Sequence, residues 1–421
     1  VVNPDNDSVS LLYTYTDPET FEQTIDVEND AFMFADTKPS SVARVGDYVA
    51  VTYSETDKLR FNLVGWWGTS PYTAWGLTFK YGSRPIASVA HGEMLYVALY
   101  GSGEIAKINT VTKQIVSLLR VGSKPKAMAL TSDGSRLLVT RFISDKDYAE
   151  VYDINTAGNM SFRDEEQPSI RINKVRVPDD IDHGSGVPNY LRSIVIGPND
   201  NIAYVTANKA NVDRGLFLNG QALDDDNTIR PMIAVLDLIN HQDANTDPLS
   251  RSNTVDLDNS ADPSGITFLP DGVTRAHALQ GNNVVEFNNL AQNTGLRVNS
   301  GFAPQSMCTT VRSLYVKNFT DRTVSVIDTS GFMYDGRQSP NVHTLVTVDP
   351  ENEVKTAEEL RGLQVFYHAR SPDISPEGYM SCASCHDDGG HDGMTWDLTH
   401  MGEGLRNTLS LRGASGTRFG N

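Results

Sequence analysis

The segment RPIASVAHGEMLYVALYGSGEIAKINTVTKQIVSLLRVG, residues 84–122, carries the pattern that decides the fold. It opens on an arginine and a proline and then alternates short apolar stretches, such as MLYVAL at 94–99, with polar turns that contain glycine. Apolar and polar residues that alternate with a period of two indicate strands with one buried face. Residues 84–122 therefore predict short antiparallel strands joined by tight turns.

The same pattern recurs between residues 38 and 331. Further copies begin at Lys38, Lys124, Val187, Asp262 and Ala303. Units of three or four short strands, repeated about every 40 residues, stack as the blades of a propeller because each blade buries its neighbour's face. We expect a seventh copy to be split between the two ends of the chain, with residues 11–27 (LLYTYTDPETFEQTIDV) supplying some of its strands. The sequence thus predicts a mainly β fold, with a seven-bladed β-propeller over residues 1–340.

The repeats resemble the YVTN-type β-propeller repeats of exported bacterial and archaeal proteins. The resemblance is carried by YVALYGSGEIAKIN (96–109), YVTANKANVD (204–213) and YVKNFTDRTVSVID (315–328). It implies a fold rather than an activity, because propellers serve as enzymes, binding surfaces and scaffolds.

Charge and hydropathy exclude several kinds of partner. The chain has 53 acidic and 35 basic side chains and a formal net charge of −18. So negative a surface repels nucleic acid, and no apolar run is long enough to form a transmembrane helix. Acidic loops at 178–186, 223–228 and 256–265 could offer oxygen ligands to Ca²⁺, but none has the spacing of an EF-hand, and solvated turns explain them better. His91, His183, His277 and His343 occur singly and are expected to be structural or surface residues.

Two of the three cysteines lie in YMSCASCH, residues 379–386. Cys382, Cys385 and His386 form the C-x-x-C-H pattern of c-type haem attachment, in which two thiols bind the haem vinyl groups and the histidine binds iron. Zinc would need two more ligands at suitable spacing, and a redox dithiol would be expected in a thioredoxin-like βαβ unit. We therefore expect one covalent haem c. Cys308, the third cysteine, is expected to be a small core residue.

Haem attachment also predicts a compartment. Thioether formation takes place outside the bacterial cytoplasm, so we expect a periplasmic, extracellular or cell-surface protein. The chain opens with VVNPDNDS, without an initiator methionine, and we expect that a signal peptide has been removed or the chain trimmed.

The segment 356–416 resembles the N-terminal haem domain of the bacterial di-haem cytochrome c peroxidases and MauG-like proteins. Matching elements are G-x-x-V-F at 362–366, SCASCHD at 381–387, HDG at 391–393 and RNT-x-SL at 406–411. The resemblance implies a small α-helical cytochrome c domain over 341–421, with His386 as the proximal ligand. His400 or Met401 would be the sixth ligand, ahead of Met394, His391 or an open position, and Arg406 could pair with a haem propionate.

The resemblance stops short of the complete family pattern. Those peroxidases carry a second C-x-x-C-H, whereas this sequence ends at Asn421, 35 residues after His386, so the domain could be truncated. Three hypotheses follow. The first is one-electron transfer to a redox partner protein or another cytochrome, with the propeller as a docking scaffold. The second is a peroxidase-like oxidoreductase whose second haem lies outside this chain. The third is a non-catalytic surface or assembly cytochrome. The sequence does not choose an oligomeric state.

Overall fold

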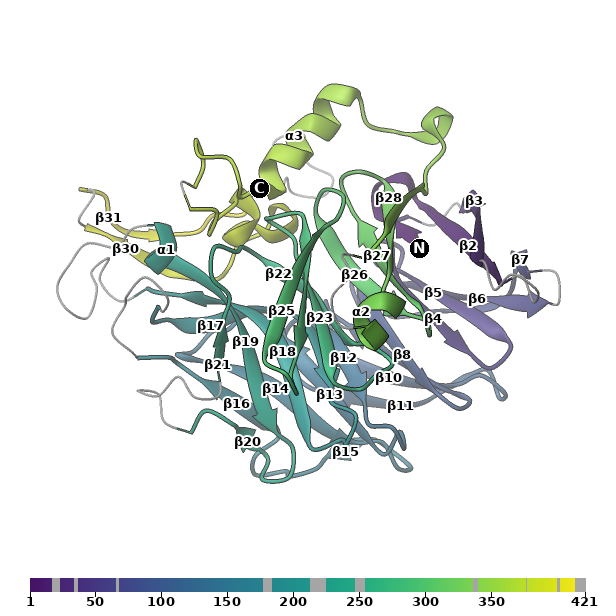
Figure 1. Ribbon diagram of the computed structural model, residues 1–421. Helices are drawn as coiled ribbons and strands as arrows, with labels where there is room; N and C mark the ends of the chain where they lie inside the picture. Colours follow the sequence, from purple (N-terminus) through teal and green to yellow (C-terminus); the bar gives the residue numbers. More distant parts are fainter. Residues whose placement is uncertain are drawn as a thin grey trace.

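The protein was analysed as a computed structural model, which describes residues 1–16, 23–33, 37–65, 68–176, 184–212, 225–246, 254–335, 340–375, 377–399 and 402–412. The fold is mainly β. Seven antiparallel sheets follow one another along the chain and form the blades of a propeller (Figure 1). The innermost strands of successive blades contact one another, from the second blade to the seventh. The predicted seven-bladed propeller is confirmed.

The first four blades come from residues 2–173. Blade 1 contains β1 (Val2–Asn3), β2 (Ser8–Thr16) and β3 (Gln23–Met33), and blade 2 contains β4 (Pro39–Val45), β5 (Tyr48–Tyr53), β6 (Lys58–Gly65) and β7 (Gly68–Thr78). Blade 3 contains β8 (Pro85–His91), β9 (Met94–Leu99), β10 (Glu104–Asn109) and β11 (Gln114–Arg120). Blade 4 contains β12 (Pro125–Leu130), β13 (Arg136–Arg141), β14 (Tyr148–Asn155), β15 (Ser161–Phe162) and β16 (Ser169–Asn173).

The last three blades come from residues 187–346. Blade 5 contains β17 (Val187–Ile196), β18 (Ile202–Ala210), β19 (Ile229–Asp237), β20 (Gln242–Asp243) and β21 (Thr254–Asp256). Blade 6 contains β22 (Pro263–Phe268), β23 (Thr274–Leu279), β24 (Val284–Asn289) and β25 (Thr294–Asn299). Blade 7 contains β26 (Pro304–Thr309), β27 (Ser313–Asn318), β28 (Thr323–Asp328) and β29 (Val342–Val346). Short helices join some of these strands: η1 (Pro4–Asn6), α1 (Asp225–Thr228) and α2 (Ser330–Asp335).

The burial of each strand follows its distance from the propeller axis. In the segment 84–122, the side chains of Leu95, Val97 and Ile105 in β9 and β10 are fully buried. The outer strand β11 leaves Val116 and Leu118 exposed. A middle strand is covered on both faces by the neighbouring blades, whereas an outer strand keeps contact with water. The apolar core therefore lies between the blades.

A turn with an unusual backbone begins the inner strand of five blades. Lys38, Arg84, Lys124, Asp262 and Ala303 each precede a proline and have φ between 51° and 61°. This left-handed region is sparsely populated by residues other than glycine. In each turn the carbonyl accepts a hydrogen bond from the end of the next strand, as Arg84 does from the Tyr100 N–H at 3.0 Å. The repeated turn places one side chain per blade near the propeller axis.

The propeller closes differently from the expectation of a blade split between the chain ends. Blade 1 is built by residues 2–33 alone, and β29 stays in blade 7, so this blade runs past the boundary expected at residue 340. Side chains join the two blades: Asn3 Nδ2 donates to the Thr347 carbonyl at 3.2 Å, and Arg322 pairs with Asp5 at 3.0 Å. The N-terminal strands already supply a whole blade, which leaves the later segment free to cross the propeller.

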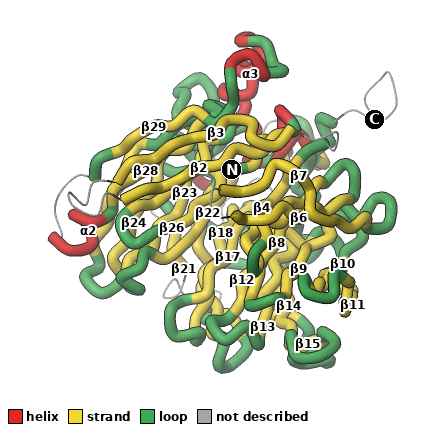
Figure 2. The backbone as a smooth tube through the Cα atoms, turned by 90° about the vertical axis from the view of Figure 1, so that its right-hand side faces the viewer, coloured by secondary structure: helices red, strands yellow, loops and turns green. Residues whose placement is uncertain are grey.

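The described part of 341–421 is less helical than expected for a cytochrome domain. It contains one α-helix, α3 (Ala357–Tyr367), the 3₁₀ turns η2 (Pro350–Asn352), η3 (Cys382–Ser384) and η4 (Asp387–Gly389), and the hairpin β30 (Thr395–Leu398) and β31 (Gly404–Asn407). Helix α3 coincides with the predicted G-x-x-V-F helix and begins with a capping box between Thr356 and Glu359. The segment lies over one end of the propeller instead of enclosing a helical core of its own (Figures 1 and 2).

Two further expectations have outcomes in the fold. Cys308 is exposed on β26 and not a core residue, because alternate residues of that strand face outward. No helix among the described residues is long and apolar enough to cross a membrane.

A buried histidine makes propeller stability dependent on pH. His277 in β23 is fully buried, and neither ring nitrogen has a hydrogen-bond partner among the described residues. Burial lowers its pKa from 6.5 to about 3, against the opposing charge of Glu286. Between pH 6.5 and pH 3 the unfolded chain binds more protons than the folded chain, so stability falls as the pH falls through this window. We expect calorimetry to show that the melting temperature of His277→Leu falls less than that of the wild type when the pH is lowered from 7 to 5.

The exposed His343 gives a control, since His343→Leu should keep the wild-type pH dependence. A wild-type pH dependence in His277→Leu would contradict the assignment.

Candidate functional site

Residues 369–398 cross the end of the propeller above blades 5 and 6 and carry the C-x-x-C-H sequence; we call them the motif segment (Figure 1). Just after α3, the Ala369 N–H donates to the Gly281 carbonyl at 2.8 Å. A Cβ atom added to Gly281 would lie 2.7 Å from the Ala261 Cβ and 3.0 Å from the Ala369 Cβ. Only a glycine at position 281 lets the motif segment approach blade 6 this closely.

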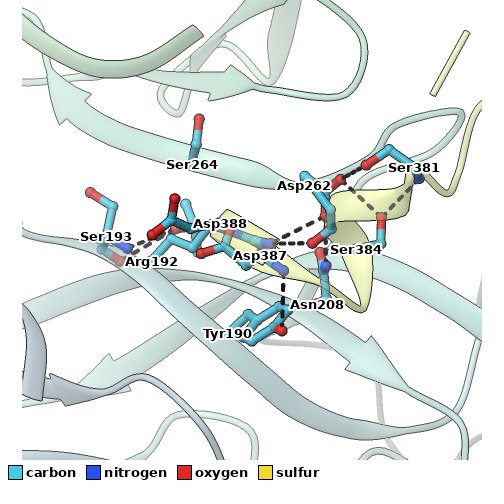
Figure 3. Close-up of polar contacts among 12 residues, drawn as sticks. Tyr190, Arg192, Ser193, Asn208, Asp262, Ser264, Ser381, Ser384, Asp387 and Asp388 are labelled. Carbon is cyan, nitrogen blue, oxygen red and sulfur yellow. Dashed lines mark hydrogen bonds and ion pairs between the residues drawn. The ribbon is translucent and has the colours of Figure 1, made fainter. Parts of the chain in front are cut away.

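The Asp262 carboxylate joins the motif segment to two blades (Figure 3). Its Oδ2 accepts hydrogen bonds from the Ser381 hydroxyl at 2.7 Å and the Ser384 hydroxyl at 2.9 Å. Its Oδ1 accepts from Asn208 Nδ2 at 2.9 Å and from the Arg192 guanidinium at 3.3 Å. The side chain is 1% exposed, so these four donors replace water around a buried charge.

Arg192 extends this network to the residue that follows the C-x-x-C-H. Its Nε contacts the Asp387 carboxylate at 3.3 Å, and its guanidinium lies 4.8 Å from the centre of the Tyr190 ring. Burial opposes the positive charge, but the carboxylates of Asp387 and Asp262 outweigh burial and raise the pKa of Arg192. Arg192 therefore stays charged between two carboxylates, one from the propeller and one from the motif segment.

Two tyrosines fix the ends of the C-x-x-C-H turn. The Tyr190 hydroxyl donates to the Cys385 carbonyl at 2.7 Å, and burial raises the pKa of this phenol well above its usual range. Tyr379, just before the motif, accepts a hydrogen bond from Arg230 at 3.0 Å and donates to the Asp258 carboxylate. Both ends of the turn are thus attached to rigid strands.

The two thiols occupy different surroundings. Cys382 is exposed, whereas Cys385 lies against an apolar cluster that contains Val187, Met394 and Trp396. Burial, followed by the Asp392 charge, raises the pKa of the Cys385 thiol far above its usual value. The Cys385 thiol is therefore held in its neutral form on the apolar side of the turn.

His386 is oriented by its own segment. Its Nδ1 lies 3.2 Å from the Gly390 carbonyl, and this contact assigns the ring proton to Nδ1. The Nε2 atom is then unprotonated and available to an electrophile such as a metal ion. A backbone carbonyl that holds Nδ1–H is the usual arrangement around a histidine that binds metal through Nε2.

Of the other predicted haem-binding residues, Met394 lies close to this turn, and two lie outside the described residues. Arg406 is on β31, exposed, and its guanidinium pairs with Glu403 at 2.9 Å. His400 and Met401 lie outside the described residues. Met394 is buried in the same apolar cluster as Cys385, and His391 Nδ1 accepts a hydrogen bond from the Gly393 N–H at 3.1 Å.

Ca²⁺ has no assembled site in the described residues, where no three His, Cys, Asp or Glu side chains converge. In the loop 256–265, Asp256 contacts Lys209, Asp258 accepts from Tyr379, and Asp262 holds the motif segment. These carboxylates already have protein partners. Most of the loop at 178–186, and residues 223–224 of the loop at 223–228, fall outside the described residues, so Ca²⁺ binding there stays a prediction.

The residues that anchor the motif segment were not predicted from the sequence. Asp262 drew attention only as part of an acidic loop, and Arg192 and Asn208 carry no motif. The local sequence offers one sign of an anchor, the pair Ser381 and Ser384. Their hydroxyls lie on one side of a single 3₁₀ turn and share one acceptor.

No protein-family model and no curated protein matches the chain. Hydrazine synthase from Kuenenia stuttgartiensis has a similar solved structure, with a TM-score of 0.57 and 16% sequence identity over 76% of this chain and 90% of that chain. Streptogramin B lyase aligns with a TM-score of 0.48 and 10% identity over 82% of this chain and 89% of that chain. At such identity, the likeness to hydrazine synthase supports the propeller fold and implies no shared activity.

Replacing Asp262 should release the motif segment before the propeller unfolds. Asp262→Asn keeps the size of the side chain but leaves Arg192 short of a buried counter-charge, at a cost of about 3 kcal/mol. We expect limited proteolysis to cut residues 369–412 at least ten times faster than in the wild type, while the fragment that contains the blades stays folded. Asp147→Asn, at an exposed carboxylate, is the matched control. Equal cleavage rates in both variants would refute the anchoring role.

Proposed function

We propose that this chain is an exported c-type haem protein that transfers single electrons. One haem would be attached to Cys382 and Cys385, with His386 as an iron ligand. The observation that carries the proposal is the immobilised C-x-x-C-H turn, with the Nδ1 of His386 held by a backbone carbonyl at 3.2 Å. When bound, haem supplies an iron that cycles between Fe(II) and Fe(III).

The surroundings of the turn fit such a group. The thiol of Cys382 is exposed to solvent, whereas the thiol of Cys385 faces the apolar cluster. The two sides of the turn therefore differ in polarity. Trp396 and Met394 offer part of an apolar wall, which covalent attachment would supplement where enclosure is limited. Between the cysteines, Ala383 is fully buried, so the turn cannot rotate away from the propeller.

The propeller supports electron transfer by keeping the turn rigid. Buried ion pairs and hydrogen bonds from Asp262, Arg192 and Tyr190 hold the backbone around His386 in one arrangement. A ligand on rigid supports reorganises little when the charge on the iron changes. The net charge of −18 favours a basic redox protein as the partner, because opposite charge speeds encounter. Because haem is attached outside the bacterial cytoplasm, the proposal includes a periplasmic, extracellular or cell-surface location.

Absorption spectroscopy of the full chain tests the proposal. The chain should be expressed with cytochrome c maturation machinery and an export signal. We expect a covalently bound Soret-absorbing group and an intact mass increased by one haem. Cys382→Ala with Cys385→Ala should abolish both signals, since both thioether anchors are lost. Cys308→Ala should leave both unchanged. A wild-type chain without the Soret band would refute haem attachment.

Addition of peroxide separates electron transfer from the peroxidase-like alternative. A haem spectrum that is unchanged by peroxide, together with reversible one-electron reduction, is the expected result. Rapid peroxide turnover would instead identify an enzyme. His386→Ala should lower haem retention or alter the reduced spectrum, whereas His391→Ala should leave the spectrum unchanged if His391 serves only the local Gly393 contact.

A further inference from the structure

A second feature of the propeller lies at its axis, below the motif segment. A cavity of about 170 Å³ is bounded by the inner ends of blades 1 to 4 and 7, by Tyr367 of α3, and by Asp387 and Asp388 of the motif segment. The charged side chains of its wall are four cations and three carboxylates: Lys38, Arg84, Lys126, Lys317, Asp5, Asp387 and Asp388. The balance between these charges determines what the cavity can bind.

The three carboxylates are already compensated by cations. Asp5 pairs with Arg322 at 3.0 Å, and Asp387 pairs with Arg192 at 3.3 Å. These two acids are therefore not available to neutralise other cations of the cavity wall.

The third carboxylate, Asp388, also pairs with cations. It pairs with Arg412 at 2.6 Å and lies 3.6 Å from Lys38, so Lys38 also has an acidic neighbour. No carboxylate of the cavity wall is left over.

The remaining three cations have no carboxylate partner among the described residues. They are Arg84 at the start of blade 3, Lys126 in blade 4 and Lys317 in blade 7. Each lies over an aromatic ring instead: Lys126 is 4.7 Å from the centre of the Phe142 ring, and Lys317 is 5.4 Å from that of Phe319. A cation–π contact supplies no hydrogen-bond acceptor, so the N–H groups of these side chains can still donate to oxygen atoms in the cavity.

The surroundings of Lys126 and Lys317 disfavour their charged forms. Burial lowers the pKa of Lys126, and it lowers the pKa of Lys317 from 10.5 to about 8, although the Asp5 charge opposes the shift. Among the described residues no ion pair joins these three side chains to a carboxylate, and the acids of the cavity wall, Asp5, Asp387 and Asp388, pair with other cations. Desolvated cations are normally paired, so an external anion is the missing partner.

We propose that the axial cavity binds a small anion that carries two or more negative charges on oxygen atoms. Arg84, Lys126 and Lys317 converge on it from three blades, so several oxygens can be held at once. Inorganic phosphate and a short dicarboxylate share this chemistry, and both fit a cavity of this size. The site is distinct from the C-x-x-C-H turn, and its binding does not require haem.

Titration calorimetry of the full chain, with phosphate and separately with succinate, tests the proposal. We expect at least one of the two anions to bind at one site per chain. Lys126→Met and Lys317→Met should each weaken the affinity about tenfold, the effect of losing one charge-assisted contact of about 1.4 kcal/mol. Lys80→Met is the matched control, because Lys80 is exposed and lies outside the cavity. Tighter binding of one anion would show which source is preferred.

Thermal melting guards against variants that merely misfold. Without added anion, Lys317→Met should melt no lower than the wild type, because it removes an uncompensated buried charge. Phosphate or succinate should raise the wild-type melting temperature above that in chloride of equal ionic strength, and should raise that of Lys317→Met less.

Two results would overturn the proposal. They are the absence of binding by both anions, and an affinity of Lys126→Met and Lys317→Met that equals that of the wild type.

Discussion

The buried carboxylate of Asp262 is the interaction on which the arrangement of the C-x-x-C-H turn depends. It accepts from Ser381 and Ser384 of the motif segment, and from Asn208 and Arg192 of blade 5, while its own backbone begins blade 6. A buried charge with four donors tolerates little displacement of any of them, because each lost contact exposes the cost of desolvation. Two blades and the motif segment are therefore fixed relative to one another by one side chain.

The blades and the motif segment are stabilised by different kinds of contact. The blades are stabilised by apolar side chains buried between sheets, such as Leu95 and Val97, whereas the described residues of the motif segment add few apolar contacts beyond Ala369, Ala383 and the cluster around Trp396. A segment of this length cannot bury enough apolar surface to fold by itself. It uses the charged end of the propeller as its support, which explains why one helix and a hairpin replace a helical domain.

The sequence predicted features whose cause is local. The blades follow from period-two alternation and from turns before proline, and helix α3 follows from its cap at Thr356. The anchoring of the motif could not be predicted, because Asp262 and Ser381 are 119 residues apart and no local pattern joins them. Cys308 was expected in the core because a single cysteine is commonly a small buried residue, but its side chain lies on the outward-facing side of β26. The split blade failed for another reason: residues 2–33 complete their own sheet.

The turn that is repeated before the inner strands places both acidic and basic side chains near the propeller axis. Lys38, Arg84, Lys124 and Asp262 all occupy the left-handed position before an inner strand, so each side chain starts near the axis. In blade 6 the acidic side chain of Asp262 is surrounded by donors and binds the chain's own motif segment. In blade 3 the side chain at the equivalent position, Arg84, lies over the Tyr100 ring and lines the axial cavity, with no ion pair to a carboxylate of the described residues. The ring of turns therefore carries an acid that binds the motif segment on one side of the axis and cations that line the cavity on the other side. Such polarity does not stabilise the fold, so its use must lie in what the ring binds: the motif segment on one side and an anion on the other.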